Sequence, residues 1–513
     1  MSRINTNVQS LIAQRVLTLN NRSLSTSLER LSTGLRINRG ADDPAGLIAS
    51  ENLRAEKAAI GAAISNAERA EQVVNIAEGG LQEISTLLTQ LEGLVTSSAN
   101  EAGLSAEERS ANQQQVDSIL QTIDRVAGAT SFQGNRLLNG NLDYSTTNVS
   151  AEVQDFTVHG AKLSDNNPLD VEVLVTQSAQ VGGFILSFGG GAALDLGSAG
   201  ETFVIEIAGS IGSRELSFSS GTSVASIANA VNTFTDVTGV VASATAGRLD
   251  LSSKGFGSSE FVSIKVVDDG AIAAGDGIYG LSATDTAVDD GNAATAFSAA
   301  NNAVRDSGQD ISATINGIVA VGKGLRASIN TDFLATEVLL TSGAAGSGGN
   351  AQTLGAVSAF RIEGGGADFQ LAPNVDIAGK VGIGVQNVAV RSVGRETNDA
   401  GEVFYLADLG AGKDLNLEDG DLTTAQRVIR KAIKSVSQLR GRLGSFQQNT
   451  IGATIRSLGI SLENTTAAES AIRDTDFASE SAQLTRNQIL VSASTSTLAI
   501  ANSQPQSVLQ LLG

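Results

Sequence analysis

The feature that most constrains this chain is a heptad repeat of apolar residues carried by both of its ends. Near the start, the repeat comprises Leu17, Leu24, Leu28, Leu31 and Leu35. Near the end, Phe477, Leu484, Val491 and Leu498 recur every seventh residue, with companion positions expected at Ser481, Gln488, Thr495 and Asn502. Such spacing is typical of a coiled-coil seam. Each stripe is too thin to fold alone, so we expect the two ends to pair with each other.

The first helical pattern breaks in the segment LSTGLRINRGADDPAGLIAS, residues 31–50, and then resumes. Gly34 and Gly40 loosen the helix. Asp43 followed by Pro44 is a helix start signal, with Asp as the N-cap and Pro at the first helical position. The sequence therefore predicts two helices joined by an ordered connector.

The helices on either side of the middle region carry strong apolar stripes. The stripe after Pro44 comprises Leu53, Ile60, Ala67, Val74, Leu81, Leu88 and Val95, with Ala63, Ala70, Ala77, Ile84 and Leu91 three residues after five of them. Gly79 and Gly80 interrupt it, which indicates a kink or a tight contact. The stripe near the far end comprises Ala425, Ile429, Ala432, Val436, Leu439, Leu443, Phe446, Thr450 and Ala453. We expect these segments to form a helical bundle.

A shorter helix is expected after the long one, because Ser105 and Glu108 form a capping box. Residues from about 150 to 400 differ from the ends in being rich in Gly, Ser, Thr, Ala and Val. Segments such as TFVIEI and EFVSIKVV alternate like strands, and SVASIANAVN reads as one short helix. The predicted fold class is α+β: a terminal coiled coil and helical bundle formed by both chain ends, with inserted β-rich central domains.

Composition excludes most catalytic chemistry. The 513-residue chain has no Cys and a single His, His159, which lies in an alternating, strand-like segment. No Cys nucleophile, Ser-His-Asp triad or Cys/His zinc site is therefore expected. A formal net charge of −20 argues against nucleic acid as a partner. No apolar run reaches the length of a membrane span, and the first residues lack the apolar core of a signal peptide.

Two segments imitate ligand-binding loops. GIVAVGKG, residues 317–324, nearly matches a phosphate-binding loop, but its last position is Gly324 and strand follows instead of helix. DLNLEDGD, residues 414–421, imitates a calcium loop, but the place of the bidentate Glu is Ala425. We interpret the first as a turn between strands. We interpret the second as a turn before a helix capped by Thr423 or Thr424, and we predict no cofactor and no metal.

Both ends resemble the bacterial flagellin family. INTNVQSLIAQRVL, LERLSTGLRINRGADDPAGLIASENLRAE and IDRVAGATSFQGNRLLNG are similar to its N-terminal region. RLGSFQQNTI, AAESAIRDTDFASESAQLTRNQIL and ANSQPQSVLQLL are similar to its C-terminal region. SGTSVASIANAVNTFTDVTGVVAS is similar to an insertion motif of some flagellins and of filament-cap proteins. The resemblance covers roughly the first 140 and the last 95 residues.

The resemblance implies a structural filament subunit with three regions. Residues 1–43 plus 475–513 would form an inner coiled coil, 44–165 plus 400–474 an outer helical bundle, and 166–399 a surface-exposed region of two β subdomains. The segment 31–50 would then connect the two helical layers. The implied assembly residues are Leu24, Leu28, Leu31, Leu35, Arg36, Asn38, Asp43, Pro44, Leu53, Ile60, Leu81, Leu88, Leu443, Phe477, Leu484, Val491 and Leu498.

The resemblance also implies the partners. These are further copies of the chain, hook-associated and cap proteins, the flagellar type III export apparatus, and an export chaperone that binds Phe477, Leu484, Ile489, Leu498 and Leu509. The implied location is the extracellular filament, reached without a cleaved signal peptide. Flagellins sensed by the animal Toll-like receptor carry Arg where this chain has Gln90 and Glu92, which argues against that recognition.

Two alternatives to a filament subunit are open at this point. A hook–filament junction protein shares similar ends, although the match that runs through SVLQLLG favours flagellin. An enzyme or carbohydrate binder displayed on helices would need convergent carboxylates or aromatic residues in the middle region. The aromatic residues there, such as Phe184, Phe203, Phe256 and Phe261, read better as core.

Overall fold

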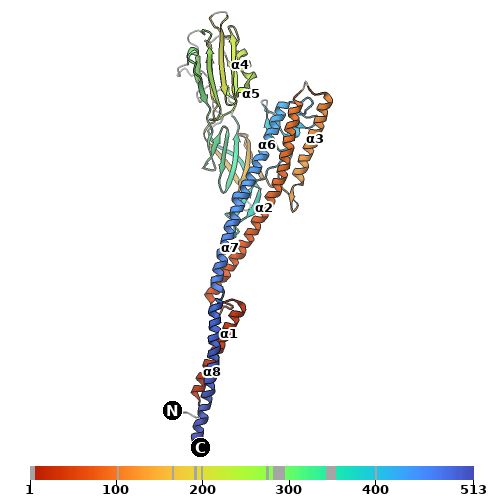
Figure 1. Cartoon of the computed structure of the whole chain (residues 1–513). Helices are drawn as coiled ribbons and strands as arrows, with labels where there is room; N and C mark the ends of the chain where they lie inside the picture. Colours follow the sequence, from red (N-terminus) through yellow and green to blue (C-terminus); the bar gives the residue numbers. More distant parts are fainter. Residues whose placement is uncertain are drawn as a thin grey trace. The chain divides into compact units, whose positions relative to one another are not determined.

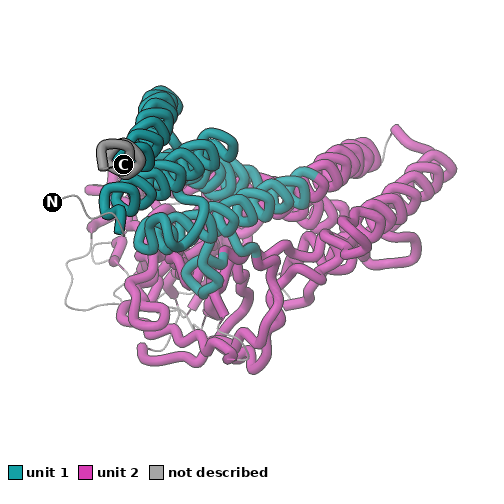
Figure 2. Tube along the Cα trace, turned by 90° about the horizontal axis from the view of Figure 1, so that it is seen from below, with its two compact units in different colours: residues 1–75, 369–380, 441–513 teal, residues 76–368, 381–440 magenta. Residues whose placement is uncertain are grey.

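The chain folds into two compact units, each built from segments that are distant in the sequence (Figure 2). The computed structural model describes residues 6–100, 103–163, 167–189, 193–197, 200–245, 247–272, 277–280, 295–342, 354–398 and 401–512. Unit 1 comprises Met1–Asn75, Phe369–Lys380 and Gly441–Gly513, and unit 2 comprises Ile76–Asp368 and Val381–Arg440. Two helices, α2 (Pro44–Ser98) and α6 (Leu422–Ser445), contribute residues to both units.

Unit 1 contains the helices of the two chain ends. Helix α1 (Val8–Thr33) begins after Asn7, whose side chain accepts a hydrogen bond from the Ser10 N–H, and it ends at Gly34 in a left-handed conformation with φ 72°. Helices α7 (Gly452–Arg473) and α8 (Phe477–Leu512) come from the other end of the chain. Helices α1 and α8 lie side by side, in red and dark blue in Figure 1. The predicted pairing of the two ends is therefore present within one chain.

A π-helix (Phe446–Ile451) joins α6 to α7 without interrupting the helical run. The predicted stripe is buried as far as Phe446, and the next fully buried residue is Ile451, not Thr450. A π turn holds more residues than an α turn, so the following face is rotated by one position. The expectation that the stripe continues through Thr450 and Ala453 is therefore wrong, and Ala453 is exposed.

The helices of unit 2 include α3 (Ala106–Ala129), which follows α2 in the chain. Its capping box is present as predicted: Ser105 Oγ accepts from the Glu108 N–H, and the Glu108 carboxylate accepts from the Ser105 N–H at 2.8 Å. On α2, the seventh-residue stripe from Ile60 to Val95 and its companion positions are buried. On α6, Asp421 caps the first turn by accepting from the N–H groups of Thr423 and Thr424. The cap is therefore Asp421, and the expectation of a threonine cap is wrong.

One β-rich core of unit 2 is enclosed by two sheets that share a single hydrophobic cluster. The sheets run in the orders β15–β14–β5–β19–β3 and β16–β17–β18–β4. Their strands are β3 (Tyr144–Thr147), β4 (Val153–Ala161), β5 (Leu169–Gln177), β14 (Ser312–Ile315), β15 (Ile318–Val319), β16 (Val321–Lys323), β17 (Arg326–Asn330), β18 (Leu334–Leu340) and β19 (Gly355–Gly365). The strands come from before and after the insertion-motif segment, so the next core is inserted into this one.

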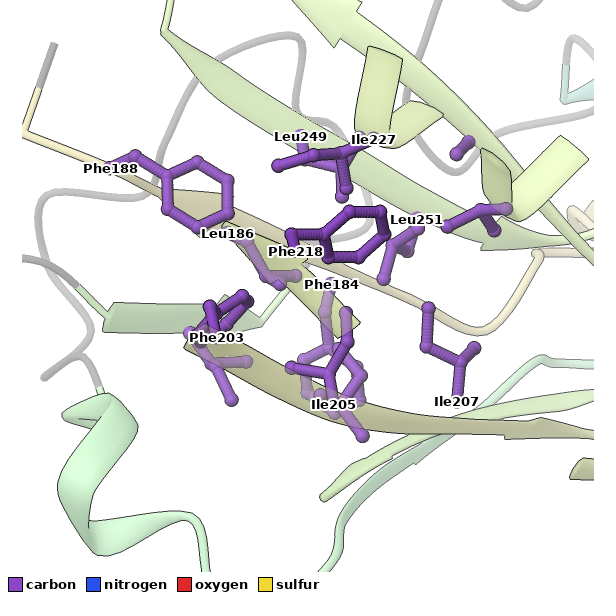
Figure 3. Packing of buried hydrophobic residues seen from close by; sticks show 14 of the residues in the cluster. Phe184, Leu186, Phe188, Phe203, Ile205, Ile207, Phe218, Ile227, Leu249 and Leu251 are labelled. Atoms are coloured by element: carbon purple, nitrogen blue, oxygen red, sulfur yellow. The ribbon is translucent and has the colours of Figure 1, made fainter. Parts of the chain in front are cut away.

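The second β-rich core of unit 2 contains that motif. Its sheets run in the orders β12–β6–β10–β9 and β13–β11–β7–β8. Their strands are β6 (Gly183–Ser187), β7 (Thr202–Gly209), β8 (Ser213–Ser219), β9 (Val240–Thr245), β10 (Arg248–Ser253), β11 (Phe261–Asp268), β12 (Gly277–Gly280) and β13 (Val304–Ser307). Helix α4 (Val224–Thr233), which the sequence predicted, buries Ile227 and Val231 in the shared cluster, and α5 (Thr235–Thr238) follows. Figure 3 shows Phe184, Phe203 and Leu251 in this core.

The remaining elements are short. They are β1 (Ser131–Phe132), β2 (Asn135–Arg136), β20 (Ala367–Gln370), β21 (Lys380–Ile383), β22 (Glu396–Thr397), β23 (Val403–Phe404) and the 3-10 helices Phe297–Ala299 and Leu406–Leu409. Helical ends around a β-rich middle confirm the α+β class. Among the described residues, no helix has the length and apolar character needed to cross a membrane.

Candidate assembly interface

The two terminal helices meet along a seam that alternates apolar and small polar layers. On α1, the facing positions are Ser10, Ala13, Leu17, Asn20, Leu24, Ser27 and Leu31, which are buried or half-buried. On α8, they are Glu480, Leu484, Asn487, Val491, Ser494, Leu498 and Ala501. Steps of three and four residues on both helices define a coiled-coil contact. The predicted residues Leu24, Leu31, Leu484, Val491 and Leu498 thus lie in one seam.

The companion positions predicted on α8 are wrong by one residue. Ser481, Gln488, Thr495 and Asn502 are exposed, whereas Asn487, Ser494 and Ala501 are each less than a tenth exposed. The sequence reasoning missed Asn487 and Ser494, and their α1 counterparts Asn20 and Ser27, because polar residues give no hydrophobic signal. The available signal was their spacing of three and four residues from the apolar positions.

Other predicted assembly residues lie outside this seam. Leu28 is 50% exposed on α1, and Phe477 is 61% exposed at the start of α8. Ile489, predicted to bind a chaperone, is 64% exposed. Leu509 lies within α8, and its side chain falls outside the described residues. A single exposed apolar side chain is normal on a folded chain, whereas several gathered on neighbouring helices mark a contact surface.

The connector between α1 and α2 is tied to the break between α7 and α8. The Arg36 N–H donates to the Arg473 carbonyl at 2.7 Å, and the Thr475 N–H donates to the Gly34 carbonyl at 2.9 Å. Leu35, half-buried, forms an antiparallel bridge with Asp474. The two helical interruptions therefore form one joint, which holds the start of α8 against the end of α1.

Side chains reinforce the joint. The Arg36 guanidinium donates to the Ile472 carbonyl at 2.5 Å and lies 3.7 Å from Asp43. The side-chain amide of Asn38 donates to the Leu35 carbonyl at 3.2 Å. The backbone N–H groups of Arg39 and Asn38 lower the pKa of Asp42, with smaller contributions from Arg30 and Arg39. The connector is thus ordered by backbone and charge contacts.

The start of α2 confirms the predicted signal. Pro44 is its first residue, and the Asp43 carboxylate accepts from the Gly46 N–H at 2.9 Å. A Cβ on Gly46 would lie 2.5 Å from the capping carboxylate of Asp43 and 2.7 Å from the fully buried Ile37, so a larger residue there would displace both side chains.

The remaining predicted residues lie on α2 and α6. Leu53 is half-buried, whereas Ile60, Leu81, Leu88 and Leu443 are at most 2% exposed. Ile60 packs with Ala63 and Leu458 within unit 1. These side chains form interior packing of the chain, so any part they take in assembly acts through the shape of the helices.

The two segments that imitate ligand loops have other structures. The interpretation of residues 317–324 as one turn between strands is wrong: Ile318–Val319 and Val321–Lys323 form β15 and β16. The turns lie at the two ends, where Gly317 and Gly324 have positive φ angles of 80° and 58°. Residues 414–421 form turns that lead to the Asp421 cap. Within the described part of the chain, no group of three or more His, Cys, Asp or Glu side chains could hold a metal ion. His159 lies in β4, as predicted, 3.9 Å from Glu337.

Comparisons with known proteins extend over the whole chain. Residues 4–143 match the model of the bacterial flagellin N-terminal helical region, 427–512 match that of the C-terminal helical region, and 202–255 match the flagellin hook IN motif. The chain is 28% identical over 546 residues to flagellin B of Helicobacter pylori strain J99 and 28% identical over 547 residues to the flagellin of Salmonella choleraesuis strain SC-B67. Each alignment covers 99% of both proteins.

A solved structure of FliC from Burkholderia pseudomallei is 14% identical over 74% of this chain and 99% of its own. The TM-score of this comparison is 0.23.

The matched N-terminal, C-terminal and IN-motif regions place this chain among the structural proteins of the bacterial flagellum. This chain belongs to the bacterial flagellin family and is a structural subunit of the flagellar filament. It is not an enzyme. The junction-protein alternative is not favoured, because the relatives that match from end to end are flagellins.

Proposed function

We propose that the α1–α8 pair is the surface through which copies of this chain polymerise. The supporting observation is the gathering of exposed apolar side chains on these helices. On α1 they are Val8, Leu11, Ile12, Val16, Leu19 and Leu28, and on α8 they are Phe477, Ile489, Leu490 and Ile500, each at least 41% exposed. Contact with neighbouring copies would bury this surface and so drive association.

Such contacts produce a filament if they are heterologous. A head-to-tail contact whose rotation does not close generates an open helical fibre. In this proposal, residues 1–43 plus 475–513 form the inner layer, 44–165 plus 400–474 supply the helices of the outer layer, and 166–399 form the surface. The strands β3 and β4 lie within 44–165 but belong to the β-rich core, so the helical part of that segment ends before Tyr144. The joint, which Arg36, Asn38, Asp43 and Pro44 reinforce, holds the chain where it passes from the inner layer to the outer layer. The chain is exported and polymerises outside the cell, and the filament transmits motor torque for swimming.

The apolar layers of the seam provide the test. Leu484→Asp places a carboxylate in the α1–α8 contact, where burial of an unpaired charge is strongly unfavourable. We expect seeded polymerisation to be lost while the β-rich cores keep their unfolding temperature. The Leu484→Met variant is the matched control, because it keeps an apolar side chain of similar volume. Filaments of normal length from Leu484→Asp would contradict the proposal.

We also infer which partners handle the chain before and during export. We infer that a chaperone covers the apolar side chains of α8 before export, at Phe477, Leu484, Ile489, Leu498 and Leu509. Phe477 and Ile489 are mostly exposed in the folded chain, which supports a surface that needs covering. The type III apparatus would export the chain, and hook-associated and cap proteins would meet it at the filament ends. Secretion that continues when that apparatus is blocked would contradict this route.

A further inference from the structure

Helices α1 and α8 carry the same five-residue pattern at the positions that face each other. In order along each helix, the pattern is Leu, Asn, an apolar residue, Ser and Leu. Successive members are separated by three, four, three and four residues. On α1 it comprises Leu17, Asn20, Leu24, Ser27 and Leu31, and on α8 it comprises Leu484, Asn487, Val491, Ser494 and Leu498. The two ends of the chain thus present matching faces.

The two copies of the pattern are hydrogen-bonded to each other in antiparallel fashion. Asn20 Nδ2 donates to Ser494 Oγ at 2.7 Å, and Asn487 Nδ2 donates to Ser27 Oγ at 3.1 Å. Each asparagine therefore pairs with the serine of the other helix, in an approximately two-fold arrangement about the Leu24 and Val491 layer. A third pair lies nearer the N-terminal end of α1, where Ser10 Oγ donates to Asn502 Oδ1 at 2.7 Å.

The apolar layers alone leave the register of the pair undetermined. Leucine or valine recurs every seventh residue on both helices, so a slip of one heptad would still place apolar side chains opposite each other. The polar layers respond differently. After such a slip, Asn20 would face Asn487 or Ala501, and the asparagine–serine pairs would be lost.

Loss of these pairs is costly because the groups lie away from water. Ser27 is 4% exposed, and Asn487 and Ser494 are each 8% exposed. A buried amide or hydroxyl without a partner keeps its full desolvation penalty. Polar residues at core positions of a coiled coil specify register in this way, at some cost in stability.

We propose that Asn20, Ser27, Asn487 and Ser494 maintain the native register along the α1–α8 seam, beyond the joint at Gly34–Arg36 and Arg473–Thr475 that sets the antiparallel orientation at one end. The pattern is also self-complementary: two α1 helices from separate copies could pair Asn20 with Ser27 twice and Leu24 with Leu24. The proposal deepens the assembly role given above, yet it concerns pairing within one chain and can be tested separately from filament yield.

Disulfide trapping can read the register, because the chain contains no Cys. Ser10→Cys with Asn502→Cys reports the native register, and Ser10→Cys with Thr495→Cys reports a slip of one heptad. Each reporter pair is introduced into the otherwise unchanged chain and into an Asn20→Ala/Asn487→Ala background. We expect the ratio of native to slipped cross-link to fall about tenfold or more when both amides are removed. Thr18→Ala/Thr485→Ala, which changes exposed positions on the same helices, is the matched control.

An exchange of partners makes the test independent of folding defects. Asn20→Ser alone and Ser494→Asn alone each break the Asn20–Ser494 pair. The combined variant restores an asparagine–serine pair with the two residue types exchanged between the helices. We expect the native ratio of cross-links to return in the combined variant. A ratio that stays within about twofold of the original in the Asn20→Ala/Asn487→Ala background would overturn the proposal. Failure of the exchange variant to restore the ratio would also overturn it. Filament yield is measured alongside: lost filaments with the native ratio intact would count against the assembly role alone.

Discussion

Gly79 and Gly80 are neighbours in α2 with opposite surroundings. A Cβ added to Gly79 would meet nothing within 4 Å, whereas one added to Gly80 would lie 2.6 Å from Thr130 Oγ1 and 2.9 Å from a Leu138 methyl carbon. Of the two roles that the sequence suggested for this pair, tight contact thus describes Gly80. Both residues lie inside a helix, where glycine is less favourable than alanine.

These surroundings predict opposite effects for two matched substitutions. We expect Gly79→Ala to stabilise the folded chain by about 0.5–1 kcal/mol, through better helix propensity alone. Gly80→Ala gains the same propensity but must displace Thr130 and Leu138, so we expect a net loss of about 1–3 kcal/mol. Calorimetric unfolding of both variants checks the difference. Equal shifts in the same direction would show that the packing around Gly80 is not tight.

Tyr144 is a second residue with a specific role, at the edge of a β-rich core. Its hydroxyl accepts from the Ala161 N–H at 2.8 Å and donates to the Ala161 carbonyl at 3.2 Å, and the residue is 7% exposed. Burial raises the pKa of the hydroxyl to about 12, with further upward contributions from Asp368 and Asp143 and an opposing one from the Ala161 hydrogen bond. The folded state therefore binds this proton more tightly than the unfolded state, whose pKa is near 10.0.

We expect Tyr144→Phe to lower the free energy of unfolding by about 1–3 kcal/mol near neutral pH, because the buried Ala161 N–H loses its acceptor. The stabilisation from Tyr144 is complete below about pH 10 and is lost as the pH rises towards about 12. The difference between wild type and variant should therefore shrink over that range. Urea denaturation across the alkaline range measures it, and a constant difference would contradict the assigned pKa.

At the scale of elements, the sequence patterns predicted which helix faces are buried wherever apolar side chains form those faces. The α2 stripe could be read directly, because each of its positions from Ile60 to Val95 is a buried apolar residue or alanine. The α8 companion positions could not, because Asn487 and Ser494 are buried by pairing with Asn20 and Ser27 and not by their hydropathy. Likewise, the π-helix at Phe446–Ile451 has no signature in a pattern that assumes a constant period.

The π-helix predicts an unusual tolerance of deletion. Removing Gln448, which is exposed, would convert the segment to α-helix and bring Ile451 and Leu458 into phase with the preceding stripe. We therefore expect the helical content and the unfolding temperature to be nearly unchanged. Deleting the exposed Ser457 instead rotates Leu458 away from Ile60 and Ala63, and we expect a loss of about 2–5 kcal/mol. Circular dichroism with thermal unfolding compares the two deletions, and equal losses would contradict the re-phasing.

At the scale of the whole molecule, the β-rich cores and the terminal helices differ in how completely they bury their apolar side chains. The β-rich cores bury continuous apolar clusters and need no partner to do so. The terminal helices meet through half-buried leucines and small polar layers, and they leave large apolar side chains exposed. We infer that this pair, which is present within one chain, gains further stability when neighbouring copies cover its exposed side chains.

The central claim is therefore that the paired chain ends carry polymerisation. The most direct measurement is electron microscopy of the purified chain incubated with short filament seeds, beside a chain that lacks residues 1–43 and 475–513. We expect long filaments from the full chain and none from the shortened chain, while circular dichroism shows that the shortened chain keeps its β structure. Filaments from the shortened chain would contradict the claim that the paired ends carry polymerisation.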